Sequence, residues 1–550
     1  MNTKLLLLSL AFVSTALAGS ATWNLNPMNG DWNTAVNWAP NTVPNGATDI
    51  ATFGVSNTTE VGISASVRVD SIVFDPGAAA YNTTIATGST DTTLTISGTG
   101  IVNNSGLTQM FNLPRTTLTA PEANIVFAGA AKAGVMTVFN NGEGLNDFFA
   151  SEEFRDDSSA DHATFINNGP PDSDVPFTAG WVLFDDTSTA GNAMIINNGG
   201  MHLGGQTWFN ESSSAGEATV ICNGGAAPQN KGGLVSVIGD ATCGSATFTI
   251  SGSDFAQQGG GILELLGNTS LDDATVIANG GAMNAGHILL NFPASGGNAR
   301  VELFDNGEMD LISYNQGRQE VVTIGSLEGS GLVLNSANLT IGGNSLSTAF
   351  SGVIQDNGSG AGSVTKVGAG TLTLSGANTY TGGTVVKGGT LLVNNTTGSA
   401  TGTGLVKVAN ATLAGSGIVA GPVTMQNGGL LTPSAGAKFK TTLTIQGLLT
   451  LSSTSTYTYT FKANKNQAHT DLVVANGVAI KNAILNLSGQ ANGSLGLGLT
   501  LTVISNTSAD PISGTFANLP DGGIVTVNGN NFQASYEGGD GNDLTLTVVP

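Results

Sequence analysis

The sequence has few charged residues, few aromatic residues and almost no cysteine. Charged side chains make up 10% of its 550 residues and aromatic side chains 6%, whereas glycine, with 78 residues, is about twice as frequent as usual. Charged helix formers are therefore scarce, and few glycine-free stretches reach the average α-helix length of about 11–12 residues. A compact globule of this length would use more aromatic residues, so the composition favours strands around a thin interior of Val, Leu and Ile.

Basic residues are also scarce, since 16 Lys and Arg stand against 38 Asp and Glu, for a net charge of −22. This balance argues against nucleic acid, which requires basic patches, and against adhesion to anionic lipid. It favours solubility and leaves room for divalent cations.

The cysteines, Cys222 and Cys243, do not form a CxxC or a Cys/His zinc spacing. A disulfide is possible in an exported protein. Their different places in the repeat described below argue against that pairing. We find no nucleophile elbow, phosphate-binding loop or dinucleotide fingerprint, so the sequence identifies no catalytic residue and no cofactor. The histidines lack metal-binding spacing and are expected at the surface: His162, His202, His287 and His469.

The first 18 residues have the pattern of a secretory signal peptide. Lys4 supplies the positive charge, residues 5–13 the apolar core, and Ala16-Leu17-Ala18 the small-residue cleavage site. The apolar run is too short to span a bilayer, and no later apolar run reaches 18 residues. The sequence therefore predicts an exported chain without a transmembrane segment.

A seven-residue motif recurs from residue 136 onward. Its starts lie 27, 30, 25, 28, 28 and 25 residues apart, a near-constant period that indicates one coil of a β-solenoid per repeat. The recurrent Asn-Asn-Gly is expected at one corner, where stacked Asn side chains would form amide ladders. The copies read MTVFNNG at 136–142, ATFINNG at 163–169, AMIINNG at 193–199, ATVICNG at 218–224, ATFTISG at 246–252, ATVIANG at 274–280 and, more loosely, ARVEL from 299.

Three short alternating segments follow within residues 364–395: Gly370–Ser375, Gly383–Lys387 and Thr390–Val393. Leu372 and Leu374 alternate with threonine, as in a strand with one buried face. Glycine-rich breaks separate the segments, and no two-residue hairpin joins them, so the pattern favours coils whose strands pair with the next coil.

Residues 365–391 fit T-K-x-G-x-G-T-L-T-L-S-G-x-N-T-Y-T-G-G-T-x-V-x-x-G-T-L, which closely resembles the autotransporter-associated β-strand repeat. The resemblance implies a right-handed parallel β-helix in an exported bacterial protein and implies no shared catalytic residues. The opening TWN…GDWNTAVNW also resembles that of repeat-bearing exported proteins, especially from planctomycete- and verrucomicrobium-like bacteria.

Three of the five tryptophans, Trp23, Trp32 and Trp38, cluster in this opening. We interpret them as a cap over the open end of the first coil, because a solenoid needs terminal caps. A sugar-stacking platform is the alternative.

Acidic residues concentrate between positions 143 and 186, with Arg155 as the single basic residue. A solvated loop between coils is the favoured interpretation, and the paired acids of a polysaccharide-cleaving β-helix are the alternative. The eleven carboxylates are Glu143, Asp147, Glu152, Glu153, Asp156, Asp157, Asp161, Asp172, Asp174, Asp185 and Asp186.

Residues 538–543, GGDGND, resemble one calcium-binding nonapeptide, with Asp540 and Asp543 as the candidate Ca²⁺ ligands. The copy is single, and its apolar residues fall at Leu544 and Leu546, so a plain tight turn is favoured.

The predicted organisation is a signal peptide (1–18), a Trp-rich cap (19–60), coils (61–320), the repeat region (321–435) and a C-terminal β-domain or cap (436–550). The chain stops at Pro550, where many similar proteins begin a Pro-Glu-Pro sorting tail, so we expect either truncation or release without that anchor.

The predicted function is an exported structural or interaction solenoid, secreted or at the cell surface, adhesin-like or matrix-like. A protein that binds or cleaves polysaccharide is the alternative, and extracellular polysaccharide or cell-surface components are the expected partners.

Overall fold

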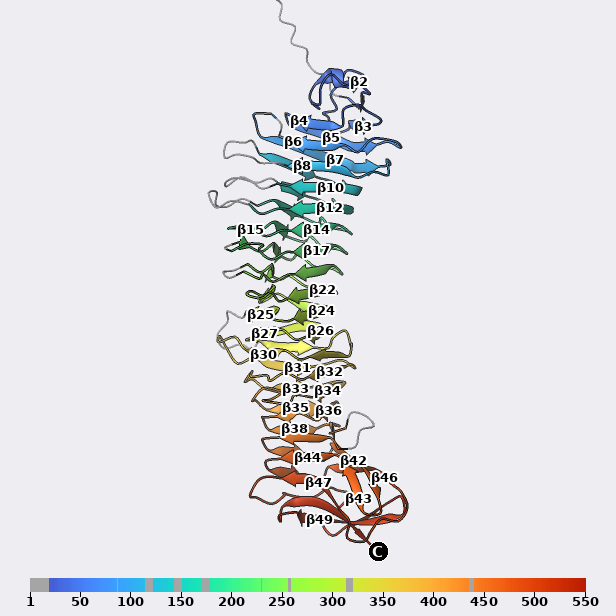
Figure 1. Cartoon of the computed structure of the whole chain (residues 1–550), viewed down its shortest axis with the longest axis vertical. Helices are drawn as coiled ribbons and strands as arrows, with labels where there is room; N and C mark the ends of the chain where they lie inside the picture. The colour runs from blue at the N-terminus through green and yellow to red at the C-terminus, as the bar shows by residue number, and fades with distance from the viewer. Residues whose placement is uncertain are drawn as a thin grey trace, which may run out of the picture. The chain divides into compact units, whose positions relative to one another are not determined.

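The computed structural model describes residues 19–86, 88–113, 122–142, 151–170, 179–228, 230–255, 259–312, 320–434 and 440–550. Over these residues the chain is all-β, with one 3-10 turn, η1 (Ala35–Asn37), and no α-helix (Figure 1). It divides into unit 1, which ends at Met194, and unit 2, which runs from Ile195 to Pro550. The predicted signal peptide lies outside the described residues. Within the described part of the chain, no helix has the length and apolarity that a membrane crossing requires.

Unit 1 is a stack of coils in which each strand pairs in parallel with its equivalent in the next coil. One sheet contains β1 (Ala21–Trp23), β3 (Ile50–Phe53), β5 (Val67–Phe74), β7 (Thr92–Asn103), β9 (Ala123–Phe127), β11 (Ser151–Phe154) and β13 (Trp181–Phe184), and β2 (Trp38–Ala39) pairs antiparallel with β1. The facing sheet contains β4 (Glu60–Ile63), β6 (Asn82–Ile85), β8 (Gln109–Leu113), β10 (Val135–Asn141) and β12 (His162–Asn167).

Unit 2 repeats this parallel stacking. One sheet contains β16 (Gln206–Phe209), β19 (Leu234–Gly239), β21 (Ile262–Gly267), β23 (His287–Asn291), β25 (Glu308–Ile312), β27 (Leu332–Asn335) and β30 (Val353–Asp356). The facing sheet contains β17 (Thr219–Cys222), β20 (Thr247–Ile250), β22 (Thr275–Asn279), β24 (Gly296–Phe304) and β26 (Val321–Gly329).

From β26 the ladder divides into two parallel rows. The first row is β28 (Asn338–Ile341), β31 (Ser363–Lys366), β33 (Thr384–Val386), β35 (Val406–Ala409), β38 (Val423–Gln426), β41 (Leu449–Leu451) and β45 (Val478–Ile480). The second row is β29 (Thr348–Phe350), β32 (Thr371–Leu374), β34 (Thr390–Val393), β36 (Thr412–Gly415), β39 (Leu430–Thr432), β42 (Thr456–Asn464) and β46 (Ile484–Ala491).

The C-terminal end of unit 2 changes from parallel to antiparallel pairing at β47. Strands on the two sides of the boundary predicted at residue 436 pair in parallel, β38 with β41 and β39 with β42. The parallel strands of this sheet are β37 (Ile418–Val419), β40 (Thr442–Ile445), β44 (Leu472–Ala475) and β47 (Thr500–Asn506), and the antiparallel strands are β50 (Asp543–Val549), β49 (Asn530–Gly538) and β48 (Ile524–Val527). The remaining strands are β14 (Met194–Asn197), β15 (Gly200–Met201), β18 (Asn230–Lys231) and β43 (Gln467–Thr470).

These ladders confirm the predicted all-β parallel solenoid. In unit 2, Val220, Phe248, Val276 and Val301 are register partners, so the repeat period is the length of one coil. The predicted alignment of the first two motifs in unit 1 is wrong by one residue. A bulge between Val135 and Val138 shifts the strand, which places Phe139 opposite Phe165.

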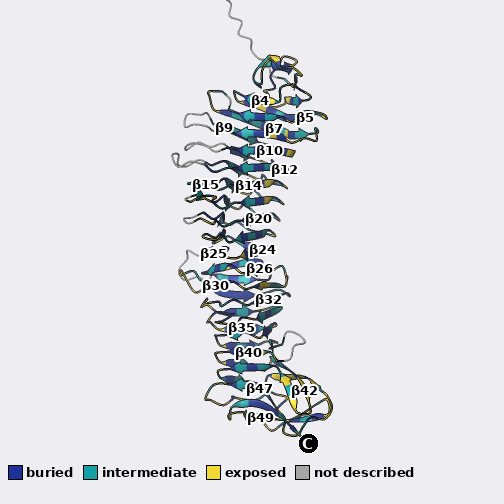
Figure 2. Cartoon of the chain, in the orientation of Figure 1, coloured by how far each residue is buried: buried dark blue, intermediate teal, exposed yellow. Residues whose placement is uncertain are grey.

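The core follows the alternation of each strand, as the buried rows in Figure 2 show. In unit 2 the interior is largely aliphatic, as the composition predicts. Unit 1 differs because phenylalanine rings stack from coil to coil. Phe127, Phe154 and Phe184 have successive centroid distances of 4.6 and 4.8 Å, and Phe139 and Phe165 stack at 4.9 Å. These phenylalanine rings of unit 1 therefore stack at equivalent positions of successive coils.

Candidate functional site

The repeat at 364–393 contains a buried lysine, Lys366, at the end of β31. Its Nζ donates to the carbonyl oxygens of Val367, Gly368 and Gly388, the last of which belongs to the next coil. Burial lowers the pKa of the Lys366 ammonium. Three carbonyl partners keep the amine hydrogen-bonded, so this motif lysine ties two coils together.

Asn378 of the same repeat joins three successive coils. Its Oδ1 accepts a hydrogen bond from the Ile354 amide at 2.7 Å, and its Nδ2 donates to the Ala400 carbonyl at 2.6 Å. Tyr380 is buried too, and its hydroxyl lies 2.6 Å from Thr384 Oγ1. The polar side chains of the motif thus form hydrogen bonds with buried backbone and side-chain groups, several of them in neighbouring coils. Their role is therefore structural rather than catalytic.

The predicted amide ladder is present on the outer side of the facing sheet in unit 1. Asn168 Nδ2 donates to Asn140 Oδ1 at 3.1 Å, and Asn140 Nδ2 donates to Asn112 Oδ1 at 3.4 Å. Asn112 Nδ2 donates in turn to Asn82. In unit 2 the same contact joins Asn223 to Asn198 at 2.8 Å. These rungs connect residues one coil apart.

The tryptophans Trp23, Trp32 and Trp38 are almost completely buried, with at most 2% of any residue's surface exposed. Trp38 packs edge-on against both other rings, at centroid distances of 5.0 and 4.9 Å, and all three contact Phe53 of β3. The cluster therefore covers the first coil, as a cap does. Burial of all three rings leaves no face open on which a sugar could stack, which argues against the sugar-stacking platform.

The described acids of the 143–186 region do not lie on an inserted loop. Asp156 and Asp186 occupy the corner that follows β11 and β13, with φ of 56° and 53°, where Gly129 stands one coil earlier. Asp156 Oδ2 accepts the Gly129 amide at 2.8 Å, and Asp186 Oδ2 accepts the Asp156 amide at 2.9 Å. The carboxylates therefore bond each corner to the one before it, which differs from the predicted solvated loop.

The other acids of this region are dispersed. Asp157 accepts a hydrogen bond from Thr187 Oγ1 at 2.7 Å, Glu153 pairs with Arg155, and Asp161 contacts His162 Nδ1 at 2.8 Å. Asp185 lies at the end of β13, beside Asp186. Outside the described residues lie Glu143, Asp147, Asp172 and Asp174.

Glu152 differs from its neighbours because its side chain points into the core of unit 1. Asn141 Nδ2 donates to its Oε2, and Asn141 Nδ2 also donates to Asn167 Oδ1 at 2.6 Å. Glu152 Oε1 and Asn141 Oδ1 are buried without a hydrogen-bond partner among the residues that the structure describes. Burial raises the pKa of Glu152 to about 8, against an ordinary 4.5, and the hydrogen bond from Asn141 offsets part of that rise. The run of acids in the sequence does not distinguish this inward carboxyl from Glu153, because a register one residue different would exchange their faces.

The calcium candidates Asp540 and Asp543 lie at the hairpin turn between β49 and β50. Asp543 Oδ1 accepts the Asn506 amide at 2.8 Å, and the Gly541 amide closes the turn on the Gly538 carbonyl at 2.9 Å. Asp540 is exposed. The described residues contain no group of three or more His, Cys, Asp or Glu side chains positioned for a metal ion.

Cys222 and Cys243 are both buried free thiols. Burial raises the pKa of the Cys222 thiol to about 12 and also raises that of Cys243, so both are protonated at neutral pH.

One cavity of about 340 Å³ lies on the outer face of unit 2. We call it the trough. Its floor comes from the first residues of four successive strands, and its wall comes from the loops that precede them. The residues are Leu203, Gly204, Gln206, Lys231, Gly232, Leu234, Gly260, Ile262, Asn284 and His287. His287 is the one of the four histidines that lines the trough.

Comparisons with known proteins agree with this architecture. The family described as Passenger-associated-transport-repeat matches residues 364–393. Among curated proteins, the chain is similar to the adhesin BmaC autotransporter of Brucella suis biovar 1 (strain 1330), with 35% identity over 104 residues. That segment is 19% of this chain and 3% of the relative, so the similarity spans a small part of the relative's length.

Parallel coils joined by buried motif side chains define a β-solenoid repeat protein. The match at 364–393 identifies this segment as a passenger-associated transport repeat, in agreement with the autotransporter-associated β-strand repeat that its sequence resembles.

Proposed function

We propose that this chain is an exported, adhesin-like protein that acts at the cell surface or after release, by binding through the outer faces of its coils. The observation that carries the proposal is the repeat at 364–393 within a parallel solenoid, together with the similarity to an autotransporter adhesin. The hydrophobic residues 5–13 and the small residues before residue 19 support export.

The role proposed is binding without catalysis. The acids at Asp156, Asp157 and Asp186 support it, because each is engaged in a hydrogen bond that joins successive coils. A carboxylate held in this way is poorly placed to move a proton or attack a substrate.

The proposal is tested by expressing the full chain in a bacterium and following it with an antibody. We expect it on intact cells or in the medium, and we expect the cells to gain adhesion to surfaces coated with extracellular polysaccharide or host-cell material. A chain lacking residues 2–18 is the matched control and should remain inside the cell.

Retention of the unaltered chain inside the cell would contradict export. Purified chain should also leave a panel of acidic and neutral polysaccharides at full length. Depolymerisation that is lost in the Asp156→Asn, Asp157→Asn double variant would instead establish an enzyme and overturn the binding role.

A further inference from the structure

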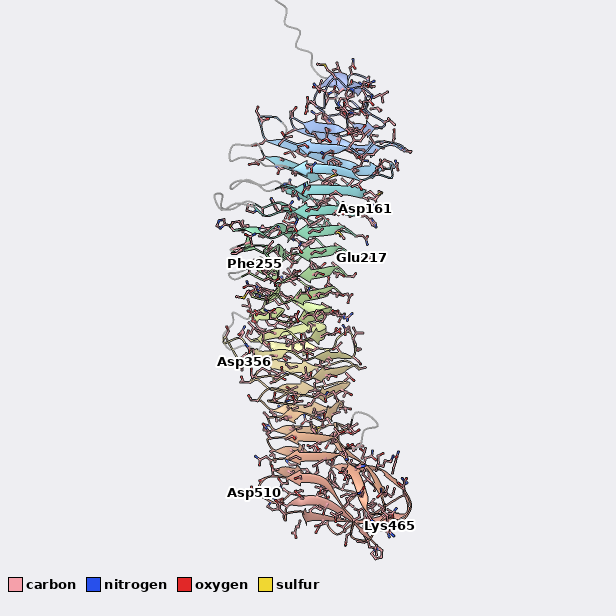
Figure 3. The ribbon with its side chains drawn as sticks, viewed as in Figure 1. Asp161, Glu217, Phe255, Asp356, Lys465 and Asp510 are labelled. Atoms are coloured by element: carbon pink, nitrogen blue, oxygen red, sulfur yellow. The ribbon has the colours of Figure 1, made fainter. Side chains whose placement is uncertain are left out.

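The trough lies across four coils of unit 2, on the side from which the loops before β19 and β21 project. Phe255 of the second of these loops is labelled in Figure 3. Gln206, Leu234, Ile262 and His287 are register partners, so one floor residue comes from each coil. Three coil steps of about 4.8 Å give a floor roughly 14 Å long, which suits an extended chain more than a single small molecule.

The wall of the trough comes from equivalent positions of successive loops. Gly204, Gly232 and Gly260 form one column, and a Cβ on Gly204 or Gly232 would lie 2.1 or 2.3 Å from the carbonyl oxygen of the next glycine. Glycine therefore lets the loops stack closely and keeps the wall free of side chains at these points. Asn284 joins two loops of successive coils, because its Nδ2 donates to the Phe255 carbonyl.

The lining of the trough combines apolar, amide and positively charged side chains. Leu203, Leu234 and Ile262 supply half-buried apolar surface, and Gln206 and Asn284 supply amides. Lys231 supplies an exposed ammonium and forms no ion pair within the described parts of the chain. His287 Nδ1 lies 3.5 Å from Glu308 Oε1 of the next coil. Glu308 is three coils away from β19, the strand that Lys231 precedes, so it does not neutralise Lys231 directly.

We propose that the trough binds an acidic polysaccharide through a sugar carboxylate that pairs with Lys231. The apolar face of each sugar ring packs on Leu234 and Ile262, and its hydroxyl groups bond to the amides at the rim. An exposed ammonium beside an apolar floor is complementary to a sugar ring that carries a carboxylate. The inference rests on the proposed binding function and names its ligand class.

The floor argues against a peptide ligand. A peptide most often binds a β-protein by adding a strand to a free sheet edge. The strands below the trough are interior to a parallel sheet, and each is paired on both sides from β19 to β23. Nucleic acid is disfavoured as well, because one lysine offers too little positive charge.

The experiment measures binding of the purified full chain to oligosaccharides of galacturonic acid and to their methyl esters, by titration calorimetry. The free acids should bind more tightly than the esters. Lys231→Gln should weaken binding of the free acid about tenfold and leave ester binding unchanged. Ile262→Asp should weaken binding of both. The matched control is Lys407→Gln, which removes an exposed lysine of β35 outside the trough and should change nothing.

Sialylated lactose, tested against lactose, distinguishes a terminal acidic sugar from a chain of uronic acids. Equal binding of acid and ester, an effect of Lys407→Gln as large as that of Lys231→Gln, or tighter binding of a carboxylate-ended peptide would each overturn the proposal. Far-ultraviolet spectra of all variants check that the fold is retained. Adhesion by cells that display the Lys231→Gln chain separates the two proposals: if adhesion persists while sugar binding is lost, adhesion does not depend on the trough.

Discussion

Glu152 shows how strongly one residue's environment depends on register. Its neighbours Glu153 and Arg155 pair at the surface of unit 1, while Glu152 lies inside, between its register partners Ile125 and Val182, and accepts a hydrogen bond from Asn141. A carboxyl group in this position stays protonated at neutral pH because burial penalises its charged form.

Glu152→Gln should therefore stabilise unit 1 at pH 7. The folded-state pKa of about 8 exceeds the ordinary 4.5, so the unfolded chain releases a proton that the folded chain retains. Below pH 4.5 the carboxyl group is protonated in both states and does not reduce the stability of the wild-type protein. As the pH rises from 4.5 toward 8, the free energy of unfolding of the wild-type protein falls. At pH 7 the difference is up to about 3 kcal/mol.

Urea unfolding of both proteins between pH 4 and 9 measures this effect. The wild-type stability should fall relative to that of the Gln variant across the window from pH 4.5 to 8. Glu153→Gln, one position away and on the outer face, is the control. A Glu152 variant whose pH dependence matched that of wild type would show that the carboxyl group is ionised in the folded chain.

At the scale of the coil, the corners decide how closely successive turns stack. The sequence predicts the three strands at 370–393 within one residue at every end, because glycine-rich breaks bound short segments that have a buried residue at every second position. Corners are harder to predict, since a glycine there can serve either a positive φ or a close approach. Gly376 is of the second kind: a Cβ on it would lie 1.8 Å from the Gly352 carbonyl oxygen.

Gly376→Ala should destabilise unit 2 by about 3 kcal/mol, because the added methyl group forces two coils apart at a point where both are backbone. Gly360→Ala is the matched control. Its Cβ would meet nothing closer than the Ser336 carbonyl oxygen at 3.6 Å, so we expect a change within about 0.5 kcal/mol. Thermal unfolding followed by circular dichroism compares the two. Equal midpoints for both variants would show that the coils separate at little cost.

At the scale of the whole molecule, each coil contacts chiefly the coils before and after it, so an end needs a cover. In unit 1 the tryptophan cluster and the antiparallel β1–β2 pair supply that cover. In unit 2 the antiparallel strands β48, β49 and β50 follow the last parallel pairing of β44 with β47. At both places the antiparallel strands cover an edge of the parallel sheet that could otherwise pair with a strand of another chain.

Trp38→Ala should loosen the first coils of unit 1 and leave its later coils intact. Removing a fully buried indole costs about 3–5 kcal/mol, and nearest-neighbour stacking confines the loss to the adjacent coils. Hydrogen exchange of β3 and β5 should accelerate while that of β11 and β13 stays slow. Trp208→Ala, which removes a half-buried indole of β16, is the control and should leave β3 and β5 unchanged. Uniform acceleration across unit 1 would argue for one cooperative block instead of a capped stack.

The sequence by itself determined the parallel solenoid, its coil length and the amide ladder, because these depend on a local period that recurs along the chain. It also indicated the tryptophan cap and the repeat at 364–393, since both rest on residues close together in the chain. Only the tertiary structure decided which face each acid takes, placing Glu152 inside and Asp156 at a corner, because a shift of one residue in register would exchange the faces of neighbouring side chains. It alone brought Lys231, Ile262 and His287 into one trough, since that trough depends on how loops of separate coils stack.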